Sequence, residues 1–125
     1  MRLFGTAILA FALVAVSCSD GPATGAPFDV PGDPVATDHV DLPRSYRFEP
    51  AVIRIEPGTE VTWTNTDDFP HTVHLLDASD VTKDLPIGGS ASIVISDAGT
   101  IYYECSIHPQ MHGKIIVTDT AAASG

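Results

Sequence analysis

The most informative stretch of the sequence lies near the C-terminus and reads Tyr103-Glu104-Cys105-Ser106-Ile107-His108-Pro109-Gln110-Met111-His112-Gly113. It spaces a thiol, an imidazole and a thioether three residues apart, at Cys105, His108 and Met111, in one tight turn after an apolar run. Cys105 is the only cysteine after Cys18, and Met111 is the only methionine after the initiator. One thiolate, one thioether and two imidazoles suit a copper ion that cycles between two oxidation states. The stretch lacks the second imidazole, so we expect that ligand from elsewhere in the chain.

The second imidazole follows a proline upstream. The stretch Asn65-Thr66-Asp67-Asp68-Phe69-Pro70-His71 leads into the apolar run Thr72-Val73-His74-Leu75-Leu76. The two patterns, Asn-x-Asp-x-x-Pro-His and Cys-x-x-His-x-x-Met, together resemble those of the cupredoxin, or blue-copper, family. The short downstream loop, with Pro109 directly after His108, is most similar to that of amicyanin and more loosely to those of plastocyanin and pseudoazurin. The resemblance covers residues 38–119, and either pattern alone would be a weak signal.

The resemblance implies one type 1 copper ion. His71, Cys105 and His108 would hold it in a near-trigonal plane, with Met111 as a weak axial ligand. Taken singly, Cys105 would be better explained as a buried core thiol and Met111 as a gap-filling side chain. Zinc is the competing metal, but its structural sites are closed by cysteines and histidines, without methionine. The ligand set therefore favours copper.

The resemblance also implies roles around the metal. Asn65 is expected to hydrogen-bond across to the backbone beside the cysteine and to clamp the two metal-bearing segments. The alternative is that Asn65 is a turn residue at a strand end. One ring edge of His108 is expected at the surface, where electrons pass, inside an apolar docking patch. The members that we expect in this patch are Phe69, Pro70, Ile107 and Pro109.

Ile107 departs from the related loop of amicyanin, which has proline just before the second histidine. Proline has no backbone N–H. We therefore expect the Ile107 amide to donate a hydrogen bond to the Cys105 sulfur, which would favour the reduced ion and raise the reduction potential. The alternative is that Ile107 only adds apolar area to the docking patch.

Three more histidines lie near the two patterns or before them. His74 comes three residues after His71, so strand alternation should turn it to the opposite face. His112 directly follows Met111 and should likewise point away from the metal, and His39 lies far upstream. We expect all three to be solvated surface residues and not ligands.

The chain is acidic, with 6 basic residues, 16 acidic residues and a formal net charge of -10 over 125 residues. Removal of Arg2 with the leader would leave 5 basic residues and a charge near -11. This balance argues against nucleic-acid binding, which needs a basic surface. It suits electrostatic steering toward a basic protein partner, although an acidic surface can also serve solubility alone.

The N-terminal third reads as leader and tether. Residues 1–17, with Arg2 before an apolar run, are expected to be a signal peptide and not a spanning helix. The segment Ala15-Val16-Ser17-Cys18 resembles a bacterial lipoprotein box with Cys18 as the lipidated residue, although Ala15 stands where leucine is preferred. An ordinary signal-peptidase site fits too. Either way the mature domain would work outside the cytoplasm, anchored to a membrane if Cys18 is lipidated.

The remaining chain predicts one domain. Residues 18–37 are rich in Gly and Pro and are expected to be a flexible tether, and residues 120–125 a disordered tail. Residues 38–119 are expected to form an all-β Greek-key sandwich of about seven to eight strands, because short apolar strands recur with no helical period. In residues 60–65, Val61 and Trp63 share one face. Residues 77–90 are the least strand-like and are expected to bridge the sheets, with room for a turn of helix.

Three classes of function are compatible with a copper site. The first is a monomeric carrier of single electrons that docks transiently with redox proteins outside the cytoplasm. The second is an extracytoplasmic lipoprotein that delivers or stores copper, which would favour open, methionine-rich sites. The third is an enzyme such as a multicopper oxidase or nitrite reductase, which needs further histidine clusters and domains. The single domain and the one internal methionine favour the carrier.

Overall fold

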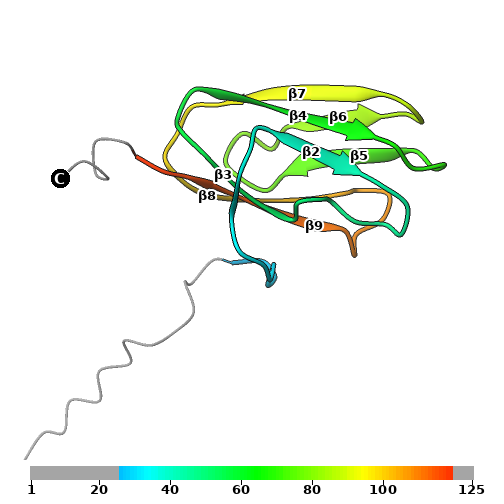
Figure 1. The fold of residues 1–125 in the computed structure, drawn as a ribbon, viewed down its shortest axis with the longest axis horizontal. Helices are drawn as coiled ribbons and strands as arrows, with labels where there is room; N and C mark the ends of the chain where they lie inside the picture. Colours follow the sequence, from blue (N-terminus) through cyan, green and yellow to red (C-terminus); the bar gives the residue numbers. More distant parts are fainter. Residues whose placement is uncertain (1–25, 120–125) are drawn as a thin grey trace, which may run out of the picture.

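Two β-sheets face each other across an apolar core in residues 26–119, the part of the chain that the computed structural model describes (Figure 1). The larger sheet has the spatial order β1 (Val35–Ala36), β3 (Val52–Ile55), β9 (His112–Val117), β8 (Gly99–Glu104), β5 (His71–Leu75) and β6 (Thr82–Leu85). The smaller sheet has the order β2 (His39–Leu42), β4 (Thr59–Asn65) and β7 (Ser90–Ile95). The predicted all-β sandwich is confirmed, with nine strands where seven to eight were expected.

The strands pair across long sequence distances. β3 runs parallel to β9, so an early strand and the last strand lie side by side in the larger sheet. β2 runs parallel to β4 in the smaller sheet, whereas β4 and β7 are antiparallel. The antiparallel pairing of β5 with β8 brings the motif near residue 70 into reach of the motif near residue 105.

Alternation along β4 follows the sequence pattern. Val61, Trp63 and Asn65 are fully buried, and the intervening Thr62 and Thr64 lie on the outer face. The two threonine hydroxyls lie 2.8 and 3.0 Å from the hydroxyls of serines on β7. The inner face therefore packs into the core and the outer face is held by polar cross-strand pairs.

Three aromatic side chains form the centre of the core. Tyr103 meets Phe48 at 4.7 Å and Trp63 at 5.5 Å between ring centroids, both in edge-to-face arrangements. All three rings are buried, and burial raises the pKa of the Tyr103 phenol far above its ordinary value. Tyr103 is thus a neutral packing residue at every physiological pH.

The segment 77–90 contains a strand that the sequence pattern did not predict. β6 pairs antiparallel with β5, and His71 stands opposite Leu85. Leu85 is its only buried residue, because β6 lies at the edge of the sheet and exposes its other three side chains. An edge strand of this kind carries no apolar alternation. The expected turn of helix is also wrong, since residues 26–119 contain no helix and hence none that could span a membrane.

The predicted flexible tether is too long at its C-terminal end. Val30 is buried, β1 pairs in parallel with β3, and the Phe28 ring stacks on His112 with centroids 3.7 Å apart. Residues 28–36 therefore form a strap against the larger sheet, and the folded domain begins about ten residues before residue 38. The apolar contacts of the strap are single and irregularly spaced, so its sequence shows no period. Residues 1–25 and 120–125, with the predicted leader and tail, lie outside the described chain.

A glycine in β9 makes room for the central aromatic ring. Gly113 pairs with Tyr103 across the β8–β9 ladder, and a Cβ added to Gly113 would stand 2.0 Å from the phenol ring. Gly113 and Tyr103 are both buried in the core, so the phenol ring has no free space into which it could move.

We predict that Gly113→Ala lowers the free energy of unfolding by about 3 kcal/mol or more, because the added methyl group forces the Tyr103 ring out of its place. Urea titration followed by circular dichroism measures the loss. Gly58→Ala is the matched control: its φ is +88° but its Cβ meets open space, so only the left-handed backbone should cost about 1 kcal/mol. Equal losses in the two variants would contradict the packing explanation.

Candidate metal centre

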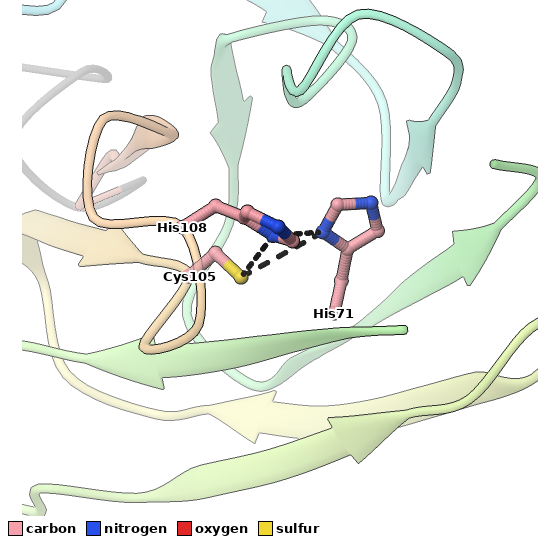
Figure 2. Close-up of side chains that lie close together, drawn as sticks. All are labelled: His71, Cys105 and His108. Carbon is pink, nitrogen blue, oxygen red and sulfur yellow. Dashed lines mark hydrogen bonds between the residues drawn. The ribbon is translucent and has the colours of Figure 1, made fainter. Parts of the chain in front are cut away.

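Three of the predicted ligands meet at one end of the larger sheet (Figure 2). β5 and β8 run antiparallel with His74 opposite Glu104, so the start of β5 lies beside the loop that follows β8. His71 is the first residue of β5, and Cys105 is the first residue after β8. His71 and Cys105 are buried, and His108 in the loop is half-buried.

The three ligand atoms form a small triangle. Nδ1 of His71 and Sγ of Cys105 are 3.7 Å apart, the same sulfur and Nδ1 of His108 are 3.9 Å apart, and the two nitrogens are 3.2 Å apart. A point in their plane lies about 2.1 Å from all three atoms, close to the lengths of metal bonds to imidazole nitrogen and thiolate sulfur, roughly 2.0–2.3 Å. The side chains therefore fit a metal ion without moving.

The predicted fourth ligand lies in the same loop. Met111 is buried, its N–H donates to the His108 carbonyl at 2.9 Å, and its carbonyl accepts from the Cys105 N–H at 3.2 Å. The loop from Cys105 to Met111 is thus closed on itself by its own backbone. These bonds fix the backbone that carries the predicted thioether ligand.

A buried carboxylate orients His71, and sequence reasoning did not identify it. Asp67 Oδ2 accepts a hydrogen bond from Nε2 of His71 at 2.8 Å, and this bond holds the pKa of Asp67 below its ordinary value. An ionised carboxylate can only accept, so Nε2 carries the proton and the lone pair of Nδ1 faces the triangle. A carboxylate behind a ligating histidine fixes the ring and its tautomer. The feature of the sequence that could have indicated this role is the position of Asp67, four residues before His71.

Thr72 joins the two metal-bearing segments. Its amide donates to the Cys105 sulfur at 3.4 Å, and its hydroxyl lies 3.8 Å from the same sulfur. The hydroxyl also accepts from the Ser106 N–H at 2.7 Å. The sulfur bond expected from Ile107 comes instead from Thr72, because the β5–β8 register brings the Thr72 backbone to the sulfur.

Asn65 is a clamp of a different kind from the one expected. Its side-chain N–H₂ donates to the carbonyls of Phe69 at 2.8 Å and Leu85 at 3.0 Å, and its Oδ1 accepts from the Asp67 N–H at 2.9 Å. The expected bond to the backbone beside Cys105 is wrong, since Thr72 takes that place. Asn65, the last residue of β4 in the smaller sheet, instead ties the loop before His71 to the end of β6 at the edge of the larger sheet.

The four residues expected in a docking patch are all exposed. Phe69 and Pro70 lie directly before His71, and Ile107 and Pro109 flank His108. Sequence reasoning missed a further member, Tyr46, whose ring centroid lies 4.7 Å from that of His108 and 5.8 Å from that of Phe69. Nothing in the spacing of the motifs links residue 46 to them.

The other three histidines lie outside the triangle. His39 is exposed and pairs with Asp41 at 3.0 Å. His74 is not freely solvated: its Nε2 lies 2.6 Å from Asp80, and this hydrogen bond raises the pKa of His74. His112 is half-buried under the Phe28 ring. The expectation of three solvated side chains thus holds for His39 alone.

Comparisons with known proteins agree with this arrangement. The cupredoxin-like domain family matches residues 7–117. Amicyanin-alpha of Methylorubrum extorquens is 35% identical over 113 residues, which is 86% of this chain and 94% of that protein. Among solved structures, an amicyanin variant in its reduced state has a TM-score of 0.59 at 28% identity, covering 69% of this chain and 92% of the other. A purple cupredoxin from Nitrosopumilus maritimus has a TM-score of 0.57 at 27% identity, covering 64% and 98%.

We predict that Thr72→Val lowers the free energy of unfolding of the metal-free protein by about 1–2 kcal/mol, because the Ser106 N–H loses its acceptor. Thr72→Ser is the matched control, since it keeps the hydroxyl and should lose less than half as much. Urea titration of both variants measures the difference. If the serine variant were as unstable as the valine variant, the methyl group and not the hydroxyl would be the important contact.

Proposed function

The chain belongs to the cupredoxin family, and on this premise we propose that it is a type 1 copper protein that carries single electrons between redox partners outside the cytoplasm. The observation that carries the proposal is the triangle of two Nδ1 atoms and one Sγ, with a point about 2.1 Å from each. As an amicyanin-like cupredoxin, the chain is an electron carrier and not an enzyme.

Four side chains would hold the copper ion. His71, Cys105 and His108 supply the triangle, and Met111 supplies a thioether that soft copper accepts and zinc disfavours. When bound, copper supplies one-electron redox chemistry between its two oxidation states. The protein keeps the ligands in place: Asp67 holds the His71 ring, and the Thr72 amide holds the Cys105 sulfur. Ligands that are fixed before the ion arrives need little rearrangement when its charge changes.

The exposed end of the site suits brief contact with a protein partner. Phe69 and Ile107 are half exposed beside the half-buried His108, so a partner could approach the imidazole over an apolar surface. Small apolar contacts of this kind are typical of weak redox encounters. The acidic surface, with a net charge of -10, would favour a partner with basic residues around its own redox centre. The carrier is expected to act as a monomer.

A copper-delivery protein is the second candidate. Delivery requires that ligands leave the ion and that an acceptor can reach it. Here Cys105, His71 and Met111 are each at most 1% exposed, and hydrogen bonds fix Cys105 and His71. A closed, pre-arranged site therefore favours the electron carrier over delivery.

We predict that the copper(II)-loaded protein absorbs intensely near the red end of the visible spectrum and that Cys105→Ser abolishes this band, because the thiolate is the source of the colour. Ser106→Ala, which changes the neighbouring exposed side chain, is the control and should keep the band. Circular dichroism should show both variants folded. A serine variant that keeps the band would refute the site, and a wild-type protein that holds only copper(I) would favour delivery.

Membrane anchoring through Cys18 is the part of the proposal that concerns location. The Ala15-Val16-Ser17-Cys18 segment supports it, and nine residues of sequence separate Cys18 from the strap. Nine extended residues reach about 30 Å, so an anchored domain would stay close to the membrane surface.

We predict that the full-length chain, expressed in a bacterial host, yields a protein that fractionates with membranes and that Cys18→Ser releases it, because the thiol that carries the lipid is gone. Mass spectrometry of the N-terminal peptide should show Cys18 as the first residue with a lipid attached. Ser19→Ala is the control and should remain anchored. An N-terminal peptide with an unmodified thiol would show that the domain is secreted free.

A further inference from the structure

The two imidazoles of the site are held in different ways. Asp67 accepts a hydrogen bond from Nε2 of His71. His108 has no such support: within residues 26–119, the polar contacts of its ring are the two Nδ1 distances of the triangle, and Nε2 has no hydrogen-bond partner. His108 also lies in a surface loop and is only half-buried. Its ring orientation must therefore come from packing.

The packing contact is an aromatic ring from a distant loop. Tyr46 lies between β2 and β3, and its centroid is 4.7 Å from that of His108 at an interplanar angle of 53°. The same ring lies 6.2 Å from His71 in an edge-on arrangement and 5.8 Å from Phe69. Tyr46 therefore covers the His108 ring and contacts the rim of the site, while 39% of it remains exposed.

The backbone that presents Tyr46 is strained. Ser45 and Tyr46 both adopt left-handed conformations, with φ of 85° and 53°, which residues other than glycine rarely do. Strained residues of this kind persist where the surroundings hold them and are frequent at ligand-holding sites.

Both sides of this short loop are fastened. Arg44 pairs with Asp68 at 2.7 Å, in the loop that leads to His71. Phe48 is buried in the core, and Asp41 and Glu49 exchange two backbone hydrogen bonds of 2.8 Å. The strained pair thus lies between a surface ion pair and a buried core residue, with the tyrosine ring directed at the site.

We propose that Tyr46 is a positioning residue for His108: its ring holds the imidazole in the orientation that directs Nδ1 into the triangle. The proposal deepens the proposed function and rests on it, since the orientation of His108 has a purpose only if the triangle binds copper. Packing against the Tyr46 ring orients the His108 imidazole, as the hydrogen bond to the Asp67 carboxylate orients the His71 imidazole. The phenol hydroxyl makes no hydrogen bond within residues 26–119, so the flat ring is the feature that the site requires.

The test compares the His108 side chain in wild type, Tyr46→Phe, Tyr46→Ala and Tyr46→Gly by NMR of the metal-free protein. We expect one rotamer and ring-to-ring NOEs in wild type and Tyr46→Phe. In the alanine and glycine variants, the population with His108 turned out of the site should rise about 2- to 12-fold, the range that a typical aromatic pair supplies. Phe69→Ala is the matched control, because Phe69 is exposed on the same face but contacts Tyr46 and not His108.

Two further measurements separate positioning from stability. Tyr46→Gly should unfold at a higher temperature than Tyr46→Ala, because glycine accepts the left-handed backbone, and yet lose the His108 order to the same extent. In copper(II)-loaded samples, the alanine variant should change the EPR and visible spectra, and the phenylalanine variant should not. Wild-type rotamers and spectra in Tyr46→Ala, or the same loss in Phe69→Ala, would overturn the proposal. A colourless wild-type protein would instead refute the proposed function, and the metal-free NMR comparison would still decide the role of Tyr46.

Discussion

The site depends on one cross-strand link, which Thr72 makes between the start of β5 and the segment that follows β8. Its amide reaches the Cys105 sulfur and its hydroxyl accepts the Ser106 N–H, so one residue binds both the ligand and the backbone that carries it. The antiparallel register of β5 and β8 makes this link possible, since a shift by one residue would turn His71 to the opposite face of the sheet. The buried side chains of the neighbouring strands pack in the arrangement that this register sets.

Packing and polar contacts both stabilise the register of the strands that carry the ligands. Tyr103 lies two residues before Cys105 on β8, and its ring fills the space over Gly113 on β9. This contact fixes β8 against β9 at the point where the metal loop leaves one strand and re-enters the other. On the opposite side, Asn65 connects the smaller sheet to the loop before His71. Packing and hydrogen bonds of the protein itself therefore hold the frame that presents the ligands.

The site is asymmetric between its two imidazoles. His71 is buried and bonded to a carboxylate, whereas His108 is half exposed and covered by an aromatic ring. A buried, hydrogen-bonded ligand keeps the ion in place, and an exposed one gives a partner access to it. The N-terminal strap adds a third element, because Phe28 packs on His112 immediately after the last predicted ligand. The strap thus connects the N-terminal end of the folded domain with the end of the metal loop.

The candidate ligands, copper as the metal and the β-sandwich could all be inferred from local features of the sequence. Cys105, His108 and Met111 could be identified because their chemistry and spacing are local, and Val61 and Trp63 could be placed in the core because strand alternation is local too. The sequence also indicated the exposed rim of the site, since those residues flank the ligands in the chain.

The residues that hold the ligands in place could be identified only from the tertiary structure. The contacts of Thr72, Asp67 and Tyr46 depend on register, on loop path and on backbone groups that every sequence contains. The edge strand β6 and the strap were invisible for a related reason: each buries few side chains, so neither has an apolar period. Residue types state which chemistry is available, and the pairing of distant strands decides which atoms meet, because a hydrogen bond or ring contact forms only within a few ångströms.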